Sequence, residues 1–145
     1  MNQQPWSHWI DIDRIQALHL EGLERYAGLR SSADLPCLES ALGAAYNAEI
    51  YSMPEVDDET VISGLTFCGY LLFYIATKQC WSDGSKRAAW SSAMWVLATQ
   101  GLTVDATDEE AYAFCMDVAE KRIARGEDVV IWIADRLIEL PTNLA

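Results

Sequence analysis

The feature that most constrains the fold is a nearly uninterrupted apolar stretch from Val61 to Thr77. A helix without a polar face has no side to turn toward water, so other elements must surround it. The stretch is about 17 residues long, which is short for a bilayer span, and it contains Ser63, Gly64, Thr66 and Gly69. We therefore predict a buried central helix and no membrane partner.

Apolar residues at three- and four-residue spacing predict five further helices around this segment. They are Asp11–Tyr26, Leu38–Tyr51, Ala88–Thr99, Thr107–Arg125 and Val129–Leu140. Thr107 and Glu110 have the spacing of a capping box, and only Ile50–Val56 and Gly101–Val104 hint at extended chain. The predicted fold class is all-α, a single-domain bundle (residues 1–145) of about six helices around the buried central one, with a loose N-terminus at residues 1–9.

Composition limits the classes of function. A hydrophobic share of 51% with 22% charged residues is typical of a globular domain. The net charge of -12 and the pI of about 4.3 argue against a nucleic-acid partner, because phosphate repels such a surface. The first residues lack the basic and apolar regions of a signal peptide, so we expect a cytoplasmic protein.

The four cysteines support the same expectation. Cys37, Cys68, Cys80 and Cys115 are widely spaced, form no C-x-x-C pair, and three of them lie in apolar surroundings. We interpret all four as reduced thiols.

Chemically distinctive residues gather in the stretch Lys78–Trp90. It places Asp83, Gly84, Ser85, Lys86 and Arg87 consecutively at the start of an expected helix. With Lys78, three cations and one aspartate give this window a local charge of +2 in a chain of -12. Free amides at a helix start bind anions, and a neighbouring aspartate can hold Mg²⁺.

A purely structural interpretation also stands. Lys86 and Arg87 would then pair with the acidic runs Glu55–Glu59 or Asp105–Glu110 on the protein's own surface.

The same stretch, K-Q-C-W-S-D-G-S-K-R, resembles the Fic/Doc signature H-x-F-x-D/E-G/A-N-K-R, in particular that of the death-on-curing toxin branch. The likeness extends to the I-x-A-L-H-x-x-x-x-x-R-Y-x-G-L pattern that begins at Ile15, to the stretch Leu97–Gly101, to the following T-D-E-E-A, and to the closing helix. It therefore covers nearly the whole chain.

The resemblance implies transfer of AMP or phosphate from a nucleoside triphosphate to a protein hydroxyl, with Mg²⁺ and ATP or another nucleotide as cofactors. Asp83 matches the metal-binding acidic residue, and Gly84 matches the anion-binding turn. Lys86 and Arg87 match the pair associated with the nucleotide phosphates. Trp81 stands in place of the buried Phe and would anchor the loop in the core.

Two positions depart from the signature. Gln79 replaces the His that accepts the proton of the attacking hydroxyl, and an amide cannot act as that base. Ser85 replaces an Asn that helps to hold phosphate oxygens. We expect a degenerate transferase site that binds Mg-nucleotide or phosphate, because loss of a positioned base removes roughly 10²- to 10⁴-fold in rate.

Other side chains are weaker candidates. We expect His19 to be a structural histidine, His8 to lie in the loose terminus, and Cys80 not to be a nucleophile. The tryptophans at positions 90, 95 and 132 are explained by core packing.

Two alternative functions stay open: a slow or altered phosphoryl or AMP transferase, and a purely structural interaction module. By resemblance, the partner is an antitoxin or a target protein, and the segment Tyr46–Glu55 falls where the family has its target-aligning flap.

Overall fold

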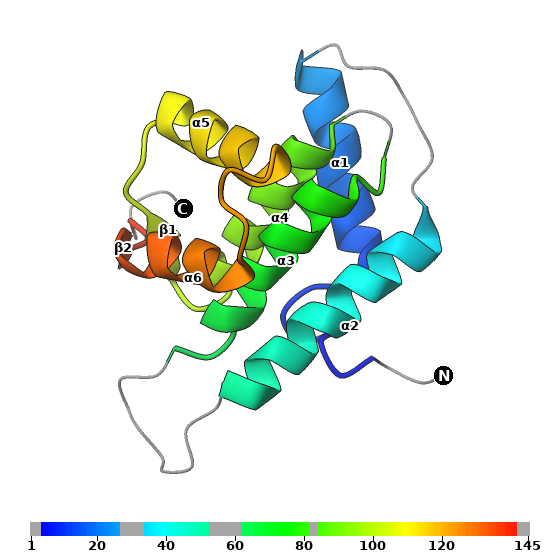
Figure 1. Ribbon diagram of the computed structural model, residues 1–145, viewed down its shortest axis with the longest axis horizontal. Helices are drawn as coiled ribbons and strands as arrows, with labels where there is room; N and C mark the ends of the chain where they lie inside the picture. Colours follow the sequence, from blue (N-terminus) through cyan, green and yellow to red (C-terminus); the bar gives the residue numbers. More distant parts are fainter. Residues whose placement is uncertain (1–3, 27–33, 53–61, 82–83, 142–145) are drawn as a thin grey trace.

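The computed structural model describes residues 4–26, 34–52, 62–81 and 84–141. In these ranges the chain forms six helices and one two-stranded antiparallel sheet, β1 with β2 (Figure 1). The elements in chain order are α1 (Ile12–Tyr26), α2 (Leu35–Ser52), α3 (Leu65–Lys78), α4 (Ser85–Ala98), β1 (Leu102–Val104), α5 (Asp108–Ala119), α6 (Gly126–Ala134) and β2 (Leu137–Glu139). The predicted all-α single-domain bundle is confirmed.

The central helix of the bundle is α3. It packs against α2, α4, α5 and α6, and Figure 1 shows it between α2 on one side and the α5 and α6 pair on the other. Phe67, Leu71, Leu72 and Ile75 on α3 are fully buried. The prediction that an apolar helix must be surrounded is confirmed, although α3 begins later than the apolar stretch does. None of the helices in the described ranges is long and apolar enough to span a bilayer.

The start of α3 is held by a buried carboxylate from α2. Glu49 is 3% exposed, and its Oε1 accepts a hydrogen bond of 3.0 Å from the backbone N–H of Phe67. A carboxylate at a helix N-terminus satisfies a free amide and interacts favourably with the helix dipole. This contact links the end of α2 to the start of the core helix.

The C-terminal part of the chain differs from the prediction. Helix α5 ends at Ala119 rather than Arg125, and α6 begins at Gly126 and ends at Ala134. The last residues of the expected helix instead form β2, which pairs Leu137 with Val104 of β1. Strand pairing joins residues far apart in sequence, so a local periodicity cannot reveal it. The extended chain expected at Gly101–Val104 is confirmed as β1.

At the other place where extended chain was expected, the structure differs. Ile50 lies within α2 and is 45% exposed, so it is not part of the buried face of that helix. Residues 53–61, which include the rest of that expected stretch and the start of the apolar segment, lie outside the described residues.

The N-terminal segment is packed rather than loose. Trp6 and Trp9 are 8% and 6% exposed, and the Trp9 ring lies 4.8 Å from that of Phe67. The expectation of a loose N-terminus is therefore wrong for residues 4–9, because two indoles supply enough apolar surface to hold the segment on the core. His8 is exposed and its ring lies 4.1 Å from that of Trp9.

The other tryptophans were expected in the core, and the structure separates them. Trp90 and Trp132 are half-buried and pack edge to face at 6.1 Å. Trp95 is 37% exposed, and the Arg14 guanidinium lies 4.2 Å from its ring centroid. Core packing therefore explains Trp90 and Trp132, whereas Trp95 covers the outside of the contact between α1 and α4.

The cysteines depart most clearly from expectation. Cys37 and Cys80 form a disulfide, with their Cα atoms 5.5 Å apart, so the expectation of four reduced thiols is wrong for this pair. Nothing in the sequence signals the pairing, because the two residues lie 43 positions apart and meet only when α2 packs on α3. Cys68 and Cys115 are free and buried, as expected.

Gly69 sets how closely α3 and α6 approach. A Cβ at this position would meet Val130 Cγ2 at 2.5 Å and the Val130 backbone at 2.9 and 3.0 Å. We predict that Gly69→Ala lowers the free energy of unfolding by about 1 to 3 kcal/mol, because the two helices must separate. Gly43→Ala on α2 is the matched control, since among the described residues outside its own helix its Cβ would meet only Trp6, at 3.9 Å. We expect that variant to gain about 0.5 to 1 kcal/mol from lower backbone entropy in the unfolded chain. Urea denaturation measures both, and equal effects would contradict the close approach.

The capping box at α5 predicts a loss of stability in acid. Glu110 Oε1 accepts from the Thr107 N–H, and this hydrogen bond holds the pKa of the Glu110 carboxyl below its usual range. A carboxyl whose pKa is lower in the folded state contributes stability above its unfolded pKa, and this contribution is lost as the pH falls through the folded pKa. Thermal melts from neutral pH to pH 3 should therefore show a steeper loss for the wild type than for Glu110→Gln. Glu109→Gln, which removes the same charge outside the capping box, should keep the wild-type slope.

Candidate functional site

The candidate site begins where α3 ends. Gln79, the C-cap residue, has φ 51° and ψ 65°, and its N–H donates to Ile75 O at 3.1 Å. A left-handed conformation is uncommon for a residue with a side chain, and such residues gather at functional sites and tight turns. The Gln79 side chain is exposed, so the position that matches the signature His lies at the surface.

The next residue, Cys80, ties this turn to α2. Its Sγ is bonded to Cys37 in the first turn of α2, and its carbonyl accepts a 2.9 Å hydrogen bond from the Asp34 N–H. Asp34 also caps α2, since its Oδ1 accepts from the Cys37 N–H at 3.1 Å. A covalent bond and a backbone hydrogen bond therefore fix Cys80 against the start of α2. Cys80 is not free to be a nucleophile, as expected.

Trp81 then anchors the turn in the core. It is 3% exposed, and its indole stacks on the imidazole of His19 from α1 at 4.2 Å with an interplanar angle of 8°. His19 is 5% exposed, so the ring pair is shielded from water. The predicted anchoring role of Trp81 is confirmed, and His19 packs as a structural side chain.

Ser85 closes the turn from the other end. Its buried hydroxyl accepts from the Trp81 N–H at 3.2 Å and donates to the Trp81 carbonyl at 3.0 Å. The predicted role of this hydroxyl in phosphate binding stays untested, but the structure shows it engaged with the backbone of Trp81. The Ser85 hydroxyl thus forms hydrogen bonds with both backbone polar groups of the buried Trp81.

Gly84 is the N-cap residue of α4 and has φ 81° and ψ 7°. Residues with a Cβ rarely adopt this conformation, so glycine suits the position. Gly84 also has no side chain to accept hydrogen bonds from the first-turn amides. The helix start is thus compatible with an anion, which would interact favourably with those amides and with the helix dipole.

Two cations lie in the first turn of α4, and each has a neighbour on a different helix. The half-buried Lys86 is close enough to the Cys115 thiol on α5 to influence its pKa. Arg87 is exposed, and its Cδ lies 3.8 Å from the Cβ position of Gly22 on α1. Side chains of consecutive helical residues point about 100° apart. Lys86 and Arg87 therefore lie on different sides of the helix start and do not form one cluster.

The predicted metal ligand, Asp83, lies outside the described residues, as does Ser82. Within the described ranges, no group of three or more His, Cys, Asp or Glu side chains is placed to hold a metal ion. The acidic run Glu55–Glu59, a possible internal partner for Lys86 and Arg87, is also outside them. In the other acidic run, the Glu110 carboxylate bonds to Thr107.

The two free thiols are poor nucleophiles. Burial raises the pKa of the Cys115 thiol to about 12, and the nearby Lys86 opposes this rise only weakly. Burial also raises the pKa of the Cys68 thiol well above its usual range, and the Cys68 Sγ lies 3.3 Å from the carbonyl of Ala93. Since the thiolate is the reactive form, neither side chain suits covalent chemistry at neutral pH.

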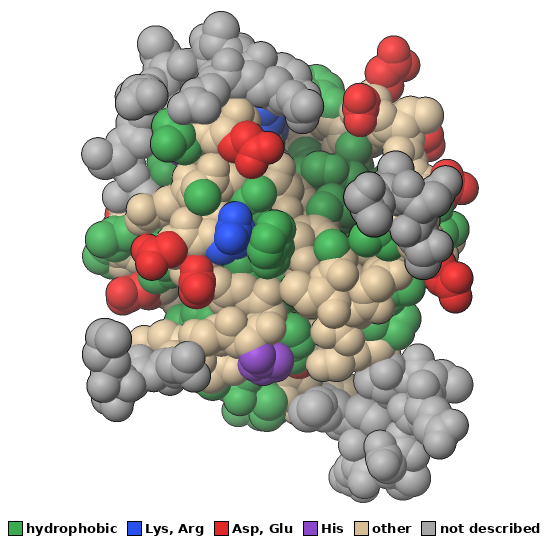
Figure 2. Space-filling model, turned by 180° about the vertical axis from the view of Figure 1, so that it is seen from behind, with side chains coloured by type: hydrophobic (Ala, Val, Ile, Leu, Met, Phe, Trp, Pro, Cys, Tyr) green, Lys and Arg blue, Asp and Glu red, His purple; other side chains and the backbone are tan. Residues whose placement is uncertain are grey.

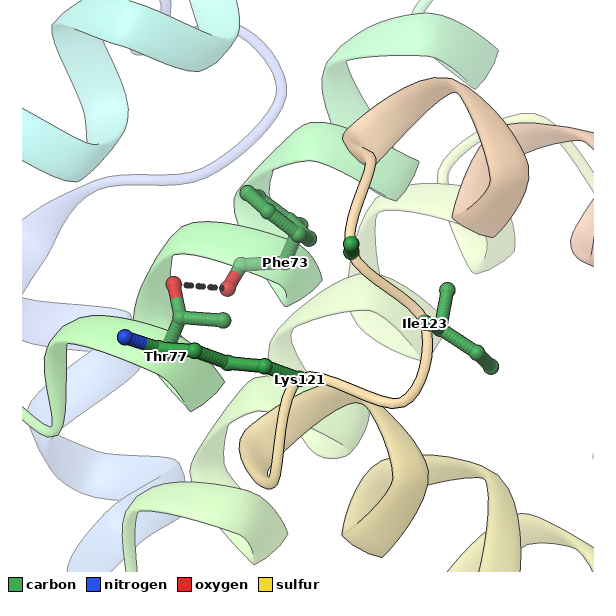
Figure 3. Close-up of a pocket in the computed structure, with 5 residues that line it drawn as sticks. Phe73, Thr77, Lys121 and Ile123 are labelled. Carbon is green, nitrogen blue, oxygen red and sulfur yellow. Dashed lines mark hydrogen bonds between the residues drawn. The ribbon is translucent and has the colours of Figure 1, made fainter.

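A shallow pocket lies beside the end of α3 and was not expected from the sequence. It has a volume of about 270 Å³ and is lined by Phe73, Thr77, Lys121, Ile123 and Ala124 (Figure 3). The Lys121 side chain extends toward Thr77, whose hydroxyl donates to the Phe73 carbonyl at 2.7 Å. Gln79 and the described residues at the start of α4 do not line this pocket, so it is separate from the candidate site.

Acidic residues outnumber basic ones in this chain, 22 to 10. On the face drawn in Figure 2, Asp and Glu side chains lie in several separate groups, and few Lys and Arg side chains are visible. A helix start with two neighbouring cations is therefore a local exception in a chain of net charge -12.

Comparison with known proteins adds no identification. No protein-family model matches this chain, and no curated protein is significantly similar to it.

The double hydrogen bond of Ser85 predicts a measurable loss of stability. We expect Ser85→Ala to lower the free energy of unfolding by about 1 to 3 kcal/mol, because the buried Trp81 N–H and carbonyl lose their partner. Ser92→Ala on the same helix is the matched control, because its buried hydroxyl has no hydrogen-bond partner among the described residues. That change should be neutral or slightly stabilising. Urea denaturation distinguishes the two, and a neutral Ser85→Ala would contradict the bridging role.

Proposed function

We propose that this chain is a Fic/Doc-like, death-on-curing-type protein that binds the phosphates of a nucleotide at the start of α4 but lacks the base for efficient transfer. The observation that carries the proposal is the start of α4 at Gly84, with a left-handed backbone, no capping side chain of its own, and Lys86 and Arg87 in the first turn. A bound anion would interact favourably with the positive end of the helix dipole and with these two cations.

The described residues on either side of this helix start make contacts with three helices. Cys80 is bonded to Cys37, Trp81 is stacked on His19, and the Ser85 hydroxyl joins both ends of the turn. Contacts of this kind reduce the conformational entropy that Cys80, Trp81 and Ser85 would lose when a ligand binds. A phosphate group at this helix start would have backbone amides as its partners, with Lys86 and Arg87 on either side.

The rest of the cofactor assignment comes from the family resemblance. Mg²⁺ would be held by Asp83 and would neutralise phosphate charge when bound. Ser85 contributes less than the signature Asn, because its hydroxyl already bonds to Trp81. The proposed ligand is thus Mg-ATP or a related nucleotide, held mainly by Gly84, Lys86 and Arg87.

Position 79 decides between binding and catalysis. Gln79 has an exposed side chain at the end of α3, but its amide cannot take a proton from an attacking hydroxyl. We therefore propose binding as the main activity, with an antitoxin or a target protein as the macromolecular partner. A slow phosphoryl or AMP transferase is the alternative, and a purely structural interaction module is the outcome if no nucleotide binds.

Calorimetric titration with ATP, ADP or AMP tests the binding proposal, with and without Mg²⁺. We expect saturable binding that Lys86→Ala and Arg87→Ala each weaken by about tenfold or more, because each removes a charged phosphate partner. Arg122→Ala is the matched control, since it removes one exposed positive charge that pairs with Asp117 and Glu120. It should leave the affinity unchanged.

A further variant, Lys121→Ala, tests whether a nucleotide binds in the pocket beside α3 instead. Affinity lost only in Lys121→Ala would place the ligand in that pocket and contradict the proposed site. Absence of heat with all three nucleotides would contradict nucleotide binding and favour the interaction module.

Radiolabel transfer separates binding from catalysis. We expect no transfer from α- or γ-labelled ATP to protein with the wild type, and transfer with the Gln79→His, Ser85→Asn double variant, because that variant restores the base. Labelling by the wild type that Asp83→Ala abolishes would contradict the degenerate-site proposal and favour a slow transferase.

A further inference from the structure

The Cys37–Cys80 disulfide is connected to the proposed phosphate site through Trp81. Cys80 stands between Gln79, with its left-handed backbone, and Trp81, whose amide and carbonyl are bonded to Ser85 in the first turn of α4. A continuous chain of bonds thus runs from α2 through Cys80 and Trp81 to the helix start that would hold phosphate.

The two cysteine residues differ in exposure. Cys37 is half-buried in the first turn of α2, whereas Cys80 is 2% exposed. Thiol–disulfide exchange depends on access to a sulfur, so we expect a thiol in solution to attack from the Cys37 side. The turn is also held by contacts that involve no sulfur, namely the stacking of Trp81 on His19 and the hydrogen bonds between Trp81 and Ser85.

We propose that the Cys37–Cys80 disulfide is a redox-sensitive latch on the candidate site. A dithiol reductant opens it, the turn Gln79–Trp81 loosens from the start of α2, and the helix start of α4 loses part of its fixed geometry. The effect on ligand affinity rests on the proposed nucleotide function, whereas the loosening of the turn does not.

The reaction balances as a two-electron exchange. One thiolate of the dithiol attacks Cys37 Sγ, a mixed disulfide forms, and the Cys80 thiolate leaves. The second thiolate of the dithiol then attacks the first sulfur of the same dithiol, which is bonded to Cys37 Sγ, and releases the Cys37 thiolate. The dithiol is oxidised to a disulfide, and its two protons end on Cys37 and Cys80.

Hydrogen exchange on oxidised and dithiothreitol-reduced protein tests the latch. The reporter amides are Asp34, which donates to the Cys80 carbonyl, and Trp81, which donates to Ser85. We expect both to exchange about tenfold faster after reduction, through local opening of the turn. Phe67 N–H, bonded to Glu49 at the opposite end of α3, is the control and should not change.

A double variant separates the latch from general destabilisation. Cys37→Ala, Cys80→Ala should show the fast exchange at Asp34 and Trp81 with or without dithiothreitol. Unchanged reporter amides after reduction, or equal acceleration at Phe67, would overturn the latch, because the disulfide would then have no local effect on the turn.

Nucleotide titration of the same samples distinguishes this proposal from the previous one. We expect ATP affinity to fall about tenfold on reduction in the wild type, and to be low and insensitive to dithiothreitol in the double variant. Fast reporter exchange with no ATP binding in either redox state would overturn the nucleotide function and support the latch. Equal ATP affinity in both states with unchanged exchange would overturn the latch and support the nucleotide function.

Discussion

The structure depends on the burial of one helix on every side. Because α3 presents apolar residues all round, its stability requires α2, α4, α5 and α6 to cover it. Both ends of α3 are then fixed by long-range contacts. At its start the Glu49 carboxylate accepts a hydrogen bond from the Phe67 amide. At its end the chain changes direction at Gln79, and the next residue, Cys80, is bonded to Cys37. The requirement to bury α3 therefore also determines where the candidate site can lie.

The turn that follows α3 combines contacts from several elements. His19 of α1 supports the indole of Trp81, Cys37 of α2 holds Cys80, and Ser85 of α4 holds the backbone of Trp81. A turn supported in this way can keep a helix start in one geometry without a ligand. The same supports also make Ser85 a structural residue, which reduces what it could offer a phosphate group.

The site itself was only partly predictable. The run from Gly84 to Arg87 was identified from local chemistry, and its position at a helix start is confirmed by the structure. The sequence could not show that Lys86 has a neighbour on α5 and Arg87 a neighbour on α1, because this depends on which helices flank α4. It also contained no signal for the pocket at Lys121, which forms only where the segment after α5 passes the end of α3.

By itself, the sequence determined the helical class and the central position of the apolar segment, together with the capping box at Thr107. These follow from local periodicity and from hydrogen bonds within three or four residues. Only the tertiary structure decided that Cys37 meets Cys80, that Trp6 and Trp9 enter the core, and that Leu137–Glu139 form β2 rather than part of a longer helix. Each of these depends on contacts between residues far apart in the chain, whose geometry is set by how the helices pack around α3.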